Sequence, residues 1–210
     1  SSFYISQSLA SLPSEADLLI FDRMCRSFNI TIPQKSELDF GFWRSELKNI
    51  IDKTVELCID EKQLEEAKEE SKRLINEVMG FNNHFDIGDD KIFELKQLAE
   101  NILAEEALPK TNRVKIEPKM PNVRAYMGRA TDAKPLASIL SLASEIAALT
   151  NKTIKANYAT GMAFATELVE QVPHSVQVKN LVESYLDAIF RLAIQWKKEY
   201  EEFKRKRCLL

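Results

Sequence analysis

The chain of 210 residues is 45% hydrophobic and 29% charged, so it can bury a core as one large domain or two small ones. Its 5 glycines and 7 prolines are few, which argues against a loop-rich all-β fold and favours long helices. No apolar run approaches the roughly 18–20 residues that cross a bilayer, so the sequence predicts no membrane segment.

The net charge of −3 conceals a difference between the two halves of the chain. Residues 1–107 contain 12 Lys and Arg against 22 Asp and Glu, whereas residues 108–210 contain 17 against 10. This difference indicates either two halves that attract each other or a basic half that binds an anionic partner. The 3 cysteines include no CxxC pair, so they predict neither a zinc site nor a redox motif.

The first two predicted helices lie in the acidic half. One begins at Ser14, because Asp17 completes an N-terminal capping pattern, and it ends before Pro33. Its apolar face is expected to contain Ala16, Leu19, Ile20, Met24 and Phe28. The second begins at Ser36 and carries a wide apolar stripe, typical of a helix packed on at least one neighbour. This stripe consists of Leu38, Phe42, Trp43, Leu47, Ile50, Ile51, Val55 and Cys58.

The third predicted helix, 60–79, is strongly charged and has only a narrow apolar seam. Glutamates cover the opposite side, with basic residues placed for i,i+3 or i,i+4 pairs. The pattern is interpreted as one arm of a coiled-coil-like hairpin, and Gly80 is expected to cap its end. The seam consists of Leu64, Ala67, Ser71, Leu74, Ile75 and Val78.

A fourth helix is predicted to follow, with Asp89 or Asp90 as its N-cap. Residues 36–103 are therefore expected to form one long helical hairpin. The apolar face of the fourth helix consists of Ile92, Leu95, Leu98, Ala99, Ile102 and Leu103.

Residues 109–135 interrupt this pattern with four prolines, and they hold seven basic residues against two acidic ones. Because proline resists helix, the segment is predicted to be an extended basic strap between the halves. Either it lies across the acidic half of the same chain, or it binds nucleic acid, with Tyr126 stacking on a base. In the first case its anchors are Val114, Ile116, Met120, Val123 and Met127. In the second case its contacts are Lys110, Arg113, Lys115, Lys119, Arg124, Arg129 and Lys134.

The same segment contains Val114-Lys115-Ile116-Glu117, an aliphatic residue, lysine, any residue and an acid. This pattern is the one read by the conjugating enzyme for small ubiquitin-like modifiers, which makes Lys115 a candidate modification site. The chemistry needs an extended, exposed strand that lets the lysine enter a groove, and flanking prolines favour such a strand. Four-residue patterns also recur by chance in many proteins.

The basic half is predicted to hold three helices. The first is capped by Thr131 or Asp132 and is apolar nearly all round to residue 149, which is typical of a helix that is central in its bundle or covered by a partner. The second, about 152–171, has small residues that permit close helix approach. The third, about 175–206, carries a seam of Leu181, Tyr185, Ile189, Leu192, Trp196 and Phe203.

Two parts of the basic half are candidate binding surfaces. The run Lys204-Arg205-Lys206-Arg207 suits nuclear import or phosphate contact, and equally a solvated helix end whose cations complement the helix dipole. The surfaces expected for a protein partner are the first apolar helix and the Trp196 seam. Their residues are Leu136, Ile139, Leu140, Leu142, Ile146, Leu149 and Trp196.

Signatures of catalysis are absent from the sequence. It has no glycine-rich phosphate loop, no HExxH and no nucleophile elbow, and its two histidines, His84 and His174, are expected at the surface. A di-iron centre in a helical bundle would need Glu-x-x-His, which does not occur. We therefore expect no catalytic residue, no metal, no cofactor and no small-molecule substrate.

One pattern resembles a known family. Phe28-Asn29-Ile30-Thr31-Ile32-Pro33 followed by Leu38, Trp43 and Leu47 is loosely repeated by Val172-Pro173 followed by Val178, Leu181 and Leu186. It is similar to the helical repeats of the PLU-1-like region in JmjC histone H3 lysine 4 demethylases and their relatives. The resemblance implies a nuclear scaffold that supports chromatin-modifying subunits. It carries over no activity, because the zinc-binding and catalytic JmjC residues of that family are absent.

The sequence thus predicts an all-α multi-helix bundle with a long helical hairpin and an extended basic strap. Its expected divisions are an acidic subdomain (1–107), the strap (108–134) and a three-helix basic subdomain (135–210). The expected function is a non-catalytic interaction or scaffold module in a nuclear chromatin or transcription assembly. The alternatives are a nucleic-acid-binding helical protein that uses the strap and the basic tail, and a viral or pathogen structural or effector protein.

Overall fold

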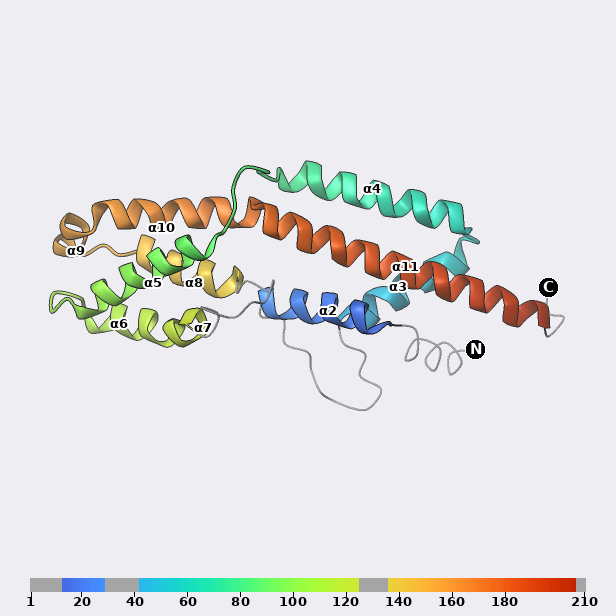
Figure 1. Ribbon diagram of the computed structural model, residues 1–210, viewed down its shortest axis with the longest axis horizontal. Helices are drawn as coiled ribbons and strands as arrows, with labels where there is room; N and C mark the ends of the chain where they lie inside the picture. The colour runs from blue at the N-terminus through green and yellow to red at the C-terminus, as the bar shows by residue number, and fades with distance from the viewer. Residues whose placement is uncertain (1–12, 29–41, 125–135, 207–210) are drawn as a thin grey trace. The chain divides into compact units, whose positions relative to one another are not determined.

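The computed structural model describes residues 13–28, 42–124 and 136–206, and within these ranges the regular elements are helices (Figure 1). The predicted all-α multi-helix bundle is confirmed. The α-helices are α2 (Glu15–Phe28), α3 (Phe42–Glu56), α4 (Glu61–Met79), α5 (Asp89–Ala104), α6 (Lys110–Ile116), α7 (Met120–Arg124), α8 (Leu136–Ala147), α9 (Lys152–Asn157), α10 (Ala159–Gln171) and α11 (Val176–Lys206). Two short 3₁₀ helices are η1 (Glu117–Lys119) and η2 (Val172–His174).

The helices belong to two compact units, neither of which is continuous in sequence. Unit 1 combines residues 1–25, 31–78 and 181–210, and unit 2 combines residues 26–30 and 79–180. This division differs from the linear one that the charge pattern predicts at residues 107 and 134. It also separates α4 from α5, so the predicted hairpin over 36–103 is wrong. The physical reason is that α4 packs on the last helix of the chain, within unit 1.

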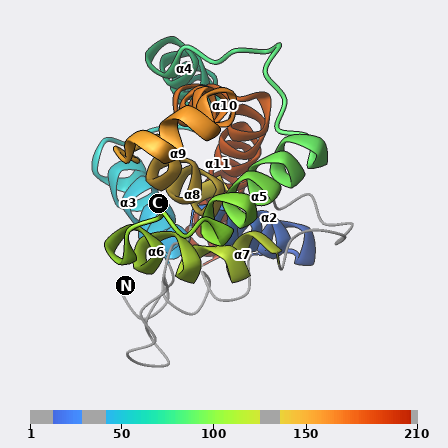
Figure 2. The ribbon, with the colours of Figure 1, turned by 90° about the vertical axis from the view of Figure 1, so that its left-hand side faces the viewer.

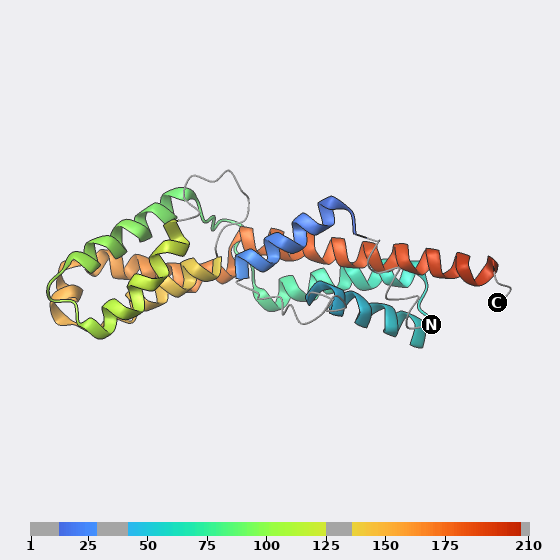
Figure 3. The same ribbon diagram turned by 90° about the horizontal axis from the view of Figure 1, so that it is seen from below.

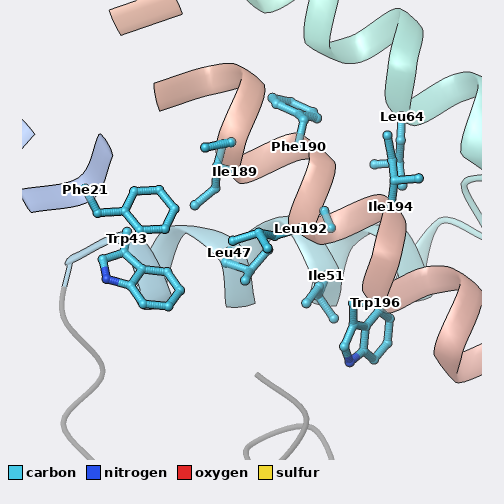
Figure 4. Close-up of a cluster of buried hydrophobic side chains, with 12 residues drawn as sticks. Phe21, Trp43, Leu47, Ile51, Leu64, Ile189, Phe190, Leu192, Ile194 and Trp196 are labelled. Atoms are coloured by element: carbon cyan, nitrogen blue, oxygen red, sulfur yellow. The ribbon is translucent and has the colours of Figure 1, made fainter. Parts of the chain in front are cut away.

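Unit 1 is built around α11, and α2, α3 and α4 lie along it (Figures 1 and 3). Phe21 of α2 stacks on Trp43 of α3 with ring centroids 4.6 Å apart, and it meets Tyr185 of α11 edge-on. Figure 4 shows the buried hydrophobic cluster to which Phe21 and Trp43 belong. Its buried members are Phe21, Trp43, Leu47, Ile51, Leu64, Ala188, Ile189, Phe190, Leu192, Ala193, Ile194 and Trp196.

The start of α2 confirms the predicted cap. The Asp17 amide donates to Ser14 Oγ (3.2 Å), and the Ser14 amide donates to Asp17 Oδ2 (3.0 Å). The apolar face predicted for this helix is wrong in part: Ala16 and Leu19 are exposed, the latter at 53%, and Asp17, Phe21 and Cys25 are buried instead. Ile20 packs against the core cluster as predicted, Met24 is half-buried, and the Phe28 side chain lies outside the described residues. Asp17 also binds the Arg191 guanidinium of α11, so this ion pair helps to set which face of α2 packs against α11.

The turn between α3 and α4 departs from the sequence prediction at Cys58. This residue was expected in an apolar helical stripe, but α3 ends at Glu56 and Cys58 is exposed at φ 54° in the left-handed region. A reciprocal cap then starts α4: the Gln63 amide donates to Asp60 Oδ1 (2.8 Å) and the Asp60 amide to Gln63 Oε1 (2.9 Å). Gly80 ends α4 at φ 57°, which confirms the predicted glycine cap.

Unit 2 has α8 at its centre, in contact with α5, α6, α7 and α10 (Figure 2). Of the two positions expected for this apolar helix, central in its bundle or covered by a partner, the first is observed. Gly161 of α10 lies so close to α5 that an added Cβ would be 2.4 Å from Leu98 Cδ1, so the predicted role of small residues is confirmed there. The buried face predicted for α5 is also confirmed: Ile92, Leu95, Leu98, Ala99 and Ile102. Gly88 is the N-cap of α5, in place of the expected Asp89 or Asp90.

The predicted extended strap is wrong over its described part, because residues 110–124 form α6, η1 and α7. Pro109 is the N-cap of α6, Pro118 lies in the first turn of η1, and Pro121 in the first turn of α7. Proline is tolerated in a first turn, where its missing amide has no helical partner in any case. Three of the expected anchors, Ile116, Met120 and Val123, are buried. Val114 is exposed, and Met127 lies outside the described residues.

Two further predictions in the basic half are corrected or left outside the structure. The single helix expected over 152–171 is broken at Tyr158 into α9 and α10. The expected caps Thr131 and Asp132, like the helix start at Ser36, lie outside the described residues. Before α11, the Asn82 amide donates to His174 O (2.7 Å) and the Val176 amide to Phe85 O (3.1 Å), which ties the segment after α4 to η2 and the start of α11.

Candidate functional site

α4 is the helix of unit 1 that buries least of itself. Its 19 residues include one buried side chain, Leu64, whereas the 12 residues of α8 include six. Two large apolar side chains of α4 remain exposed, Leu74 at 46% and Val78 at 81%. A helix that leaves large apolar side chains in water has a face that its own fold does not use.

The contact between α4 and α11 is largely polar. The Lys72 ammonium pairs with the Asp187 carboxylate, and Asn76 Nδ2 donates to Glu183 Oε1 (2.9 Å). At the other end of α4, Lys198 Nζ lies 3.0 Å from Glu61 Oε2. Leu64 is the α4 member of the core cluster (Figure 4). α4 is therefore held to α11 on one side, by one apolar anchor and several polar contacts.

Three apolar residues of α4 form what we call the α4 stripe: Ala67, Leu74 and Val78. They recur at i, i+7 and i+11, so they lie on one flank of the helix beside the side that faces α11. All three are exposed. The predicted seam thus divides: Leu64 is buried, Ser71 and Ile75 are half-buried, and the stripe is open.

The outward edge of the stripe carries charge. Glu70 and Glu77 lie two turns apart, and the Arg73 guanidinium between them donates to both, at 2.6 Å to Glu70 Oε1 and 2.9 Å to Glu77 Oε2. The hydrogen bond from Arg73 lowers the pKa of the Glu70 carboxyl below its ordinary value. The lowered pKa favours the ionised form of Glu70, and two carboxylates beside one guanidinium make the edge acidic.

The surface predicted for a protein partner is corrected by the structure. Six of its residues are buried, because α8 is enclosed by four helices and Trp196 packs in the core of unit 1. They form the core of the fold and offer no open surface; the half-buried Leu140 is the remaining member. The buried residues are Leu136, Ile139, Leu142, Ile146, Leu149 and Trp196.

Two of the basic residues expected to bind an anion are used inside unit 2. Arg113 donates to the carbonyls of Leu103 and Glu105, which caps the end of α5. Lys119 donates to Ser141 Oγ and lies 3.6 Å from Glu145 Oε1 of α8. In both cases, a side chain that was expected to bind an external anion binds an acceptor within unit 2 instead.

The other predicted basic residues are on α6, at the end of α11 or outside the described residues. Lys110 and Lys115 are exposed on α6. Lys204, Arg205 and Lys206 end α11, where Lys204 lies over the Tyr200 ring and Lys206 pairs with Glu202. The Arg124 side chain, Arg129, Lys134 and Arg207 lie outside the described residues.

The modification motif at Lys115 lies in a helix. Lys115 is exposed on α6, but Ile116 is fully buried and Glu117 begins η1. The extended strand that conjugation requires is therefore not formed in the folded chain. Modification at this position would require local unfolding of α6.

Within the described ranges, no three His, Cys, Asp or Glu side chains are placed to hold a metal ion. His84 is exposed as expected, whereas His174 is half-buried with its Nδ1 2.5 Å from Met79 O. A surface depression of about 250 Å³ along the last turns of α11 is lined by Glu199, Glu202, Phe203 and Lys206. None of the helices that the structure describes is both long enough and apolar enough to cross a bilayer.

Comparison with known proteins supplies no evidence about the function of this chain. No protein-family model matches the sequence, and no curated protein or solved structure matches it. The similarity to PLU-1-like helical repeats thus remains a prediction from the sequence.

Sequence reasoning found the residues of the stripe but not their exposure. Spacing identifies which residues share a flank of a helix, and Ala67, Leu74 and Val78 do so. It does not say whether another helix covers that flank. Equally, the ion pair of Asp17 with Arg191 joins residues far apart in sequence, and no local pattern signals it.

Proposed function

We propose that this chain is a non-catalytic helical interaction module that binds a protein partner along the α4 stripe. The observation that carries the proposal is that α4 buries one side chain and exposes Leu74 and Val78 on one flank. An amphipathic helix that lays its apolar face against another helix is a common recognition mode, with anchors at i, i+3, i+4 and i+7. Ala67, Leu74 and Val78 supply such anchors on a helix already fixed at the surface.

The setting that we propose is a nuclear chromatin or transcription assembly. Its support is the sequence resemblance around Pro33 and Pro173, together with the basic run from Lys204 to Arg207. Fusion of the full chain to a fluorescent protein tests the location: nuclear accumulation that is lost when Lys204 and Arg205 are replaced by Ala supports it. Uniform distribution of the unaltered fusion contradicts it.

The test of the stripe compares two matched double variants by affinity capture and cross-linking mass spectrometry. Leu74→Gln with Val78→Gln removes the stripe, whereas Phe93→Gln with Val114→Gln alters two exposed apolar side chains of unit 2, at 50% and 70% exposure. We expect a partner that is captured by the unaltered chain and by the unit 2 variant, cross-linked near α4, and lost from the stripe variant. A set of partners that is identical for all three proteins contradicts the proposal.

A further inference from the structure

The α4 stripe has an acidic outer border that restricts its partner. By helical spacing, the border beyond Ala67, Leu74 and Val78 consists of residues 63, 66, 70, 73 and 77, all of them exposed. Three are glutamates, Glu66, Glu70 and Glu77, and one is basic, Arg73. Any partner laid on the stripe therefore faces a net negative edge.

The pairs that these glutamates already make are weak and open to water. Glu66 lies 3.5 Å from Lys62, with side chains 64% and 86% exposed. Glu70 and Glu77 share the single Arg73, whose side chain is 59% exposed. Such solvated pairs are worth little, and one guanidinium does not balance two carboxylates. The border can therefore accept cations from a second helix.

We infer that the partner binds with an amphipathic helix whose apolar residues are bordered by Lys and Arg. This inference rests on the proposed function and deepens it. The apolar residues of the partner helix bury Leu74 and Val78, and its basic side chains pair with Glu66, Glu70 and Glu77. Charges that border a helix–helix seam set partner choice and orientation in this way.

The same border disfavours a second copy of this chain. In a two-fold symmetric antiparallel pair of α4 helices, each outer border faces the identical border of the other copy. Two borders of net negative charge would then face each other and repel. A parallel pair would instead bring the border against the α4 side that carries Lys68 and Ile75, which lies toward α11 and is half-buried.

The probe is a pair of synthetic helical peptides, about three heptads long, with leucine at every a and d position. One peptide carries lysine at e and g, and the other carries glutamate there. Binding of each to the full chain is measured by fluorescence anisotropy at low and high salt. We expect the lysine peptide to bind at least about ten-fold more tightly than the glutamate peptide at low salt, and less so at high salt.

Two double variants and one control variant assign that preference to the border and the stripe. Glu70→Gln with Glu77→Gln should reduce it to about two-fold, because both acceptors are neutralised. Glu94→Gln, an exposed glutamate of α5, should leave it unchanged. Leu74→Gln with Val78→Gln should remove binding of both peptides. Far-UV circular dichroism confirms that each variant is folded.

Several outcomes overturn the inference: equal binding of the peptides, preference for the glutamate peptide, no binding of either, or a lysine preference that survives Glu70→Gln with Glu77→Gln. A dimer of the chain alone in sedimentation, dissociated by the stripe variant, also overturns it in favour of a second copy. If a captured partner still depends on the stripe, the partner class is wrong but the proposed function stands. If capture is also independent of the stripe, both are wrong.

Discussion

α4 in unit 1 and α8 in unit 2 both place apolar residues at helical spacing, yet one is a surface helix and the other is a core helix. α8 is enclosed by α5, α6, α7 and α10 and buries half of its 12 residues. α4 is held to α11 through Leu64 and through polar pairs such as Lys72 with Asp187. The difference shows that apolar spacing marks a contact face, whereas the number of neighbouring helices decides whether that face is filled.

The largest difference between α4 and α8 should be in the rate at which their backbone amides exchange hydrogen. Amides of α8 open only with much of unit 2, whereas α4 can detach after losing few apolar contacts. We expect the slowest amides of α8 to exchange with deuterium at least about 100-fold more slowly than those of residues 65–78. Residues 188–196 of α11 serve as the control within unit 1, and they should be protected. Equal protection of the amides of α4 and α11 would contradict the conclusion that α4 is a surface helix held by few apolar contacts.

Truncation in the core of unit 2 should have the next largest effect. Leu142 is fully buried at the centre of the bundle, so Leu142→Ala should lower the free energy of unfolding by about 2–5 kcal/mol. The neighbouring Leu140→Ala, at a half-buried position, should cost clearly less. Urea unfolding followed by far-UV circular dichroism measures both. A cost for Leu142→Ala no larger than that for Leu140→Ala would mean that α8 is not enclosed.

The next largest effect should be on the stability of unit 1 at acid pH. Burial raises the pKa of the Asp17 carboxyl, but hydrogen bonds from Arg191 and Ser14 outweigh burial and hold it below the ordinary value of 3.8. A depressed pKa stabilises the fold above pH 3.8, and this stabilisation is lost as the pH falls through the folded-state pKa. Asp17→Asn should cost about 1–2 kcal/mol at neutral pH and weaken the acid dependence.

Tryptophan fluorescence reports this effect, because both tryptophans of the chain, Trp43 and Trp196, belong to the core of unit 1. Asp52→Asn, which removes an exposed pair with Lys48, is the matched control and should have little effect. An Asp17→Asn protein that keeps the full acid dependence of the unaltered chain would show that this ion pair does not set it.

The smallest effect on stability should come from the α4 stripe. Leu74→Gln and Val78→Gln should each change the free energy of unfolding by no more than about 0.5 kcal/mol, because both side chains are exposed before and after the change. Urea unfolding followed by tryptophan fluorescence measures this. A loss above about 1 kcal/mol for either would show that the fold itself uses the stripe. Leu64→Ala, the buried member of the same seam, is the positive control.

Several features of the fold could be predicted because they depend on residues close in sequence. The cap of Ser14 with Asp17, the glycine end of α4 at Gly80 and the buried face of α5 are local. The central segment could not be predicted from its prolines. Pro109, Pro118 and Pro121 each lie at a helix start, where proline is tolerated, and the spacing of prolines alone does not distinguish a series of short helices from an extended strap.

The residues of the α4 stripe were predicted as part of an interhelical seam and not as a binding site. The seam of α4 contains the right residues, whereas Leu136, Ile139 and Leu142 were expected to be a contact surface and are core. Both sets read as apolar residues on a helix, and burial depends on which other helices pack there. The charge pattern also led to a wrong expectation. Arg113 and Lys119 were expected to contact an anionic partner, but both bind acceptors inside unit 2.

By itself, the sequence determined the helical class of this protein, most helix limits and the apolar face of helices such as α5, since these follow from backbone preferences and local spacing. Tertiary structure alone decided that residues 181–210 join residues 1–25 and 31–78 in unit 1 and that residues 79–180 join residues 26–30 in unit 2. It also decided that α8 is enclosed and that the α4 stripe is open. The physical reason is that burial is a property of pairs of surfaces distant in sequence, and no single helix specifies its own partner.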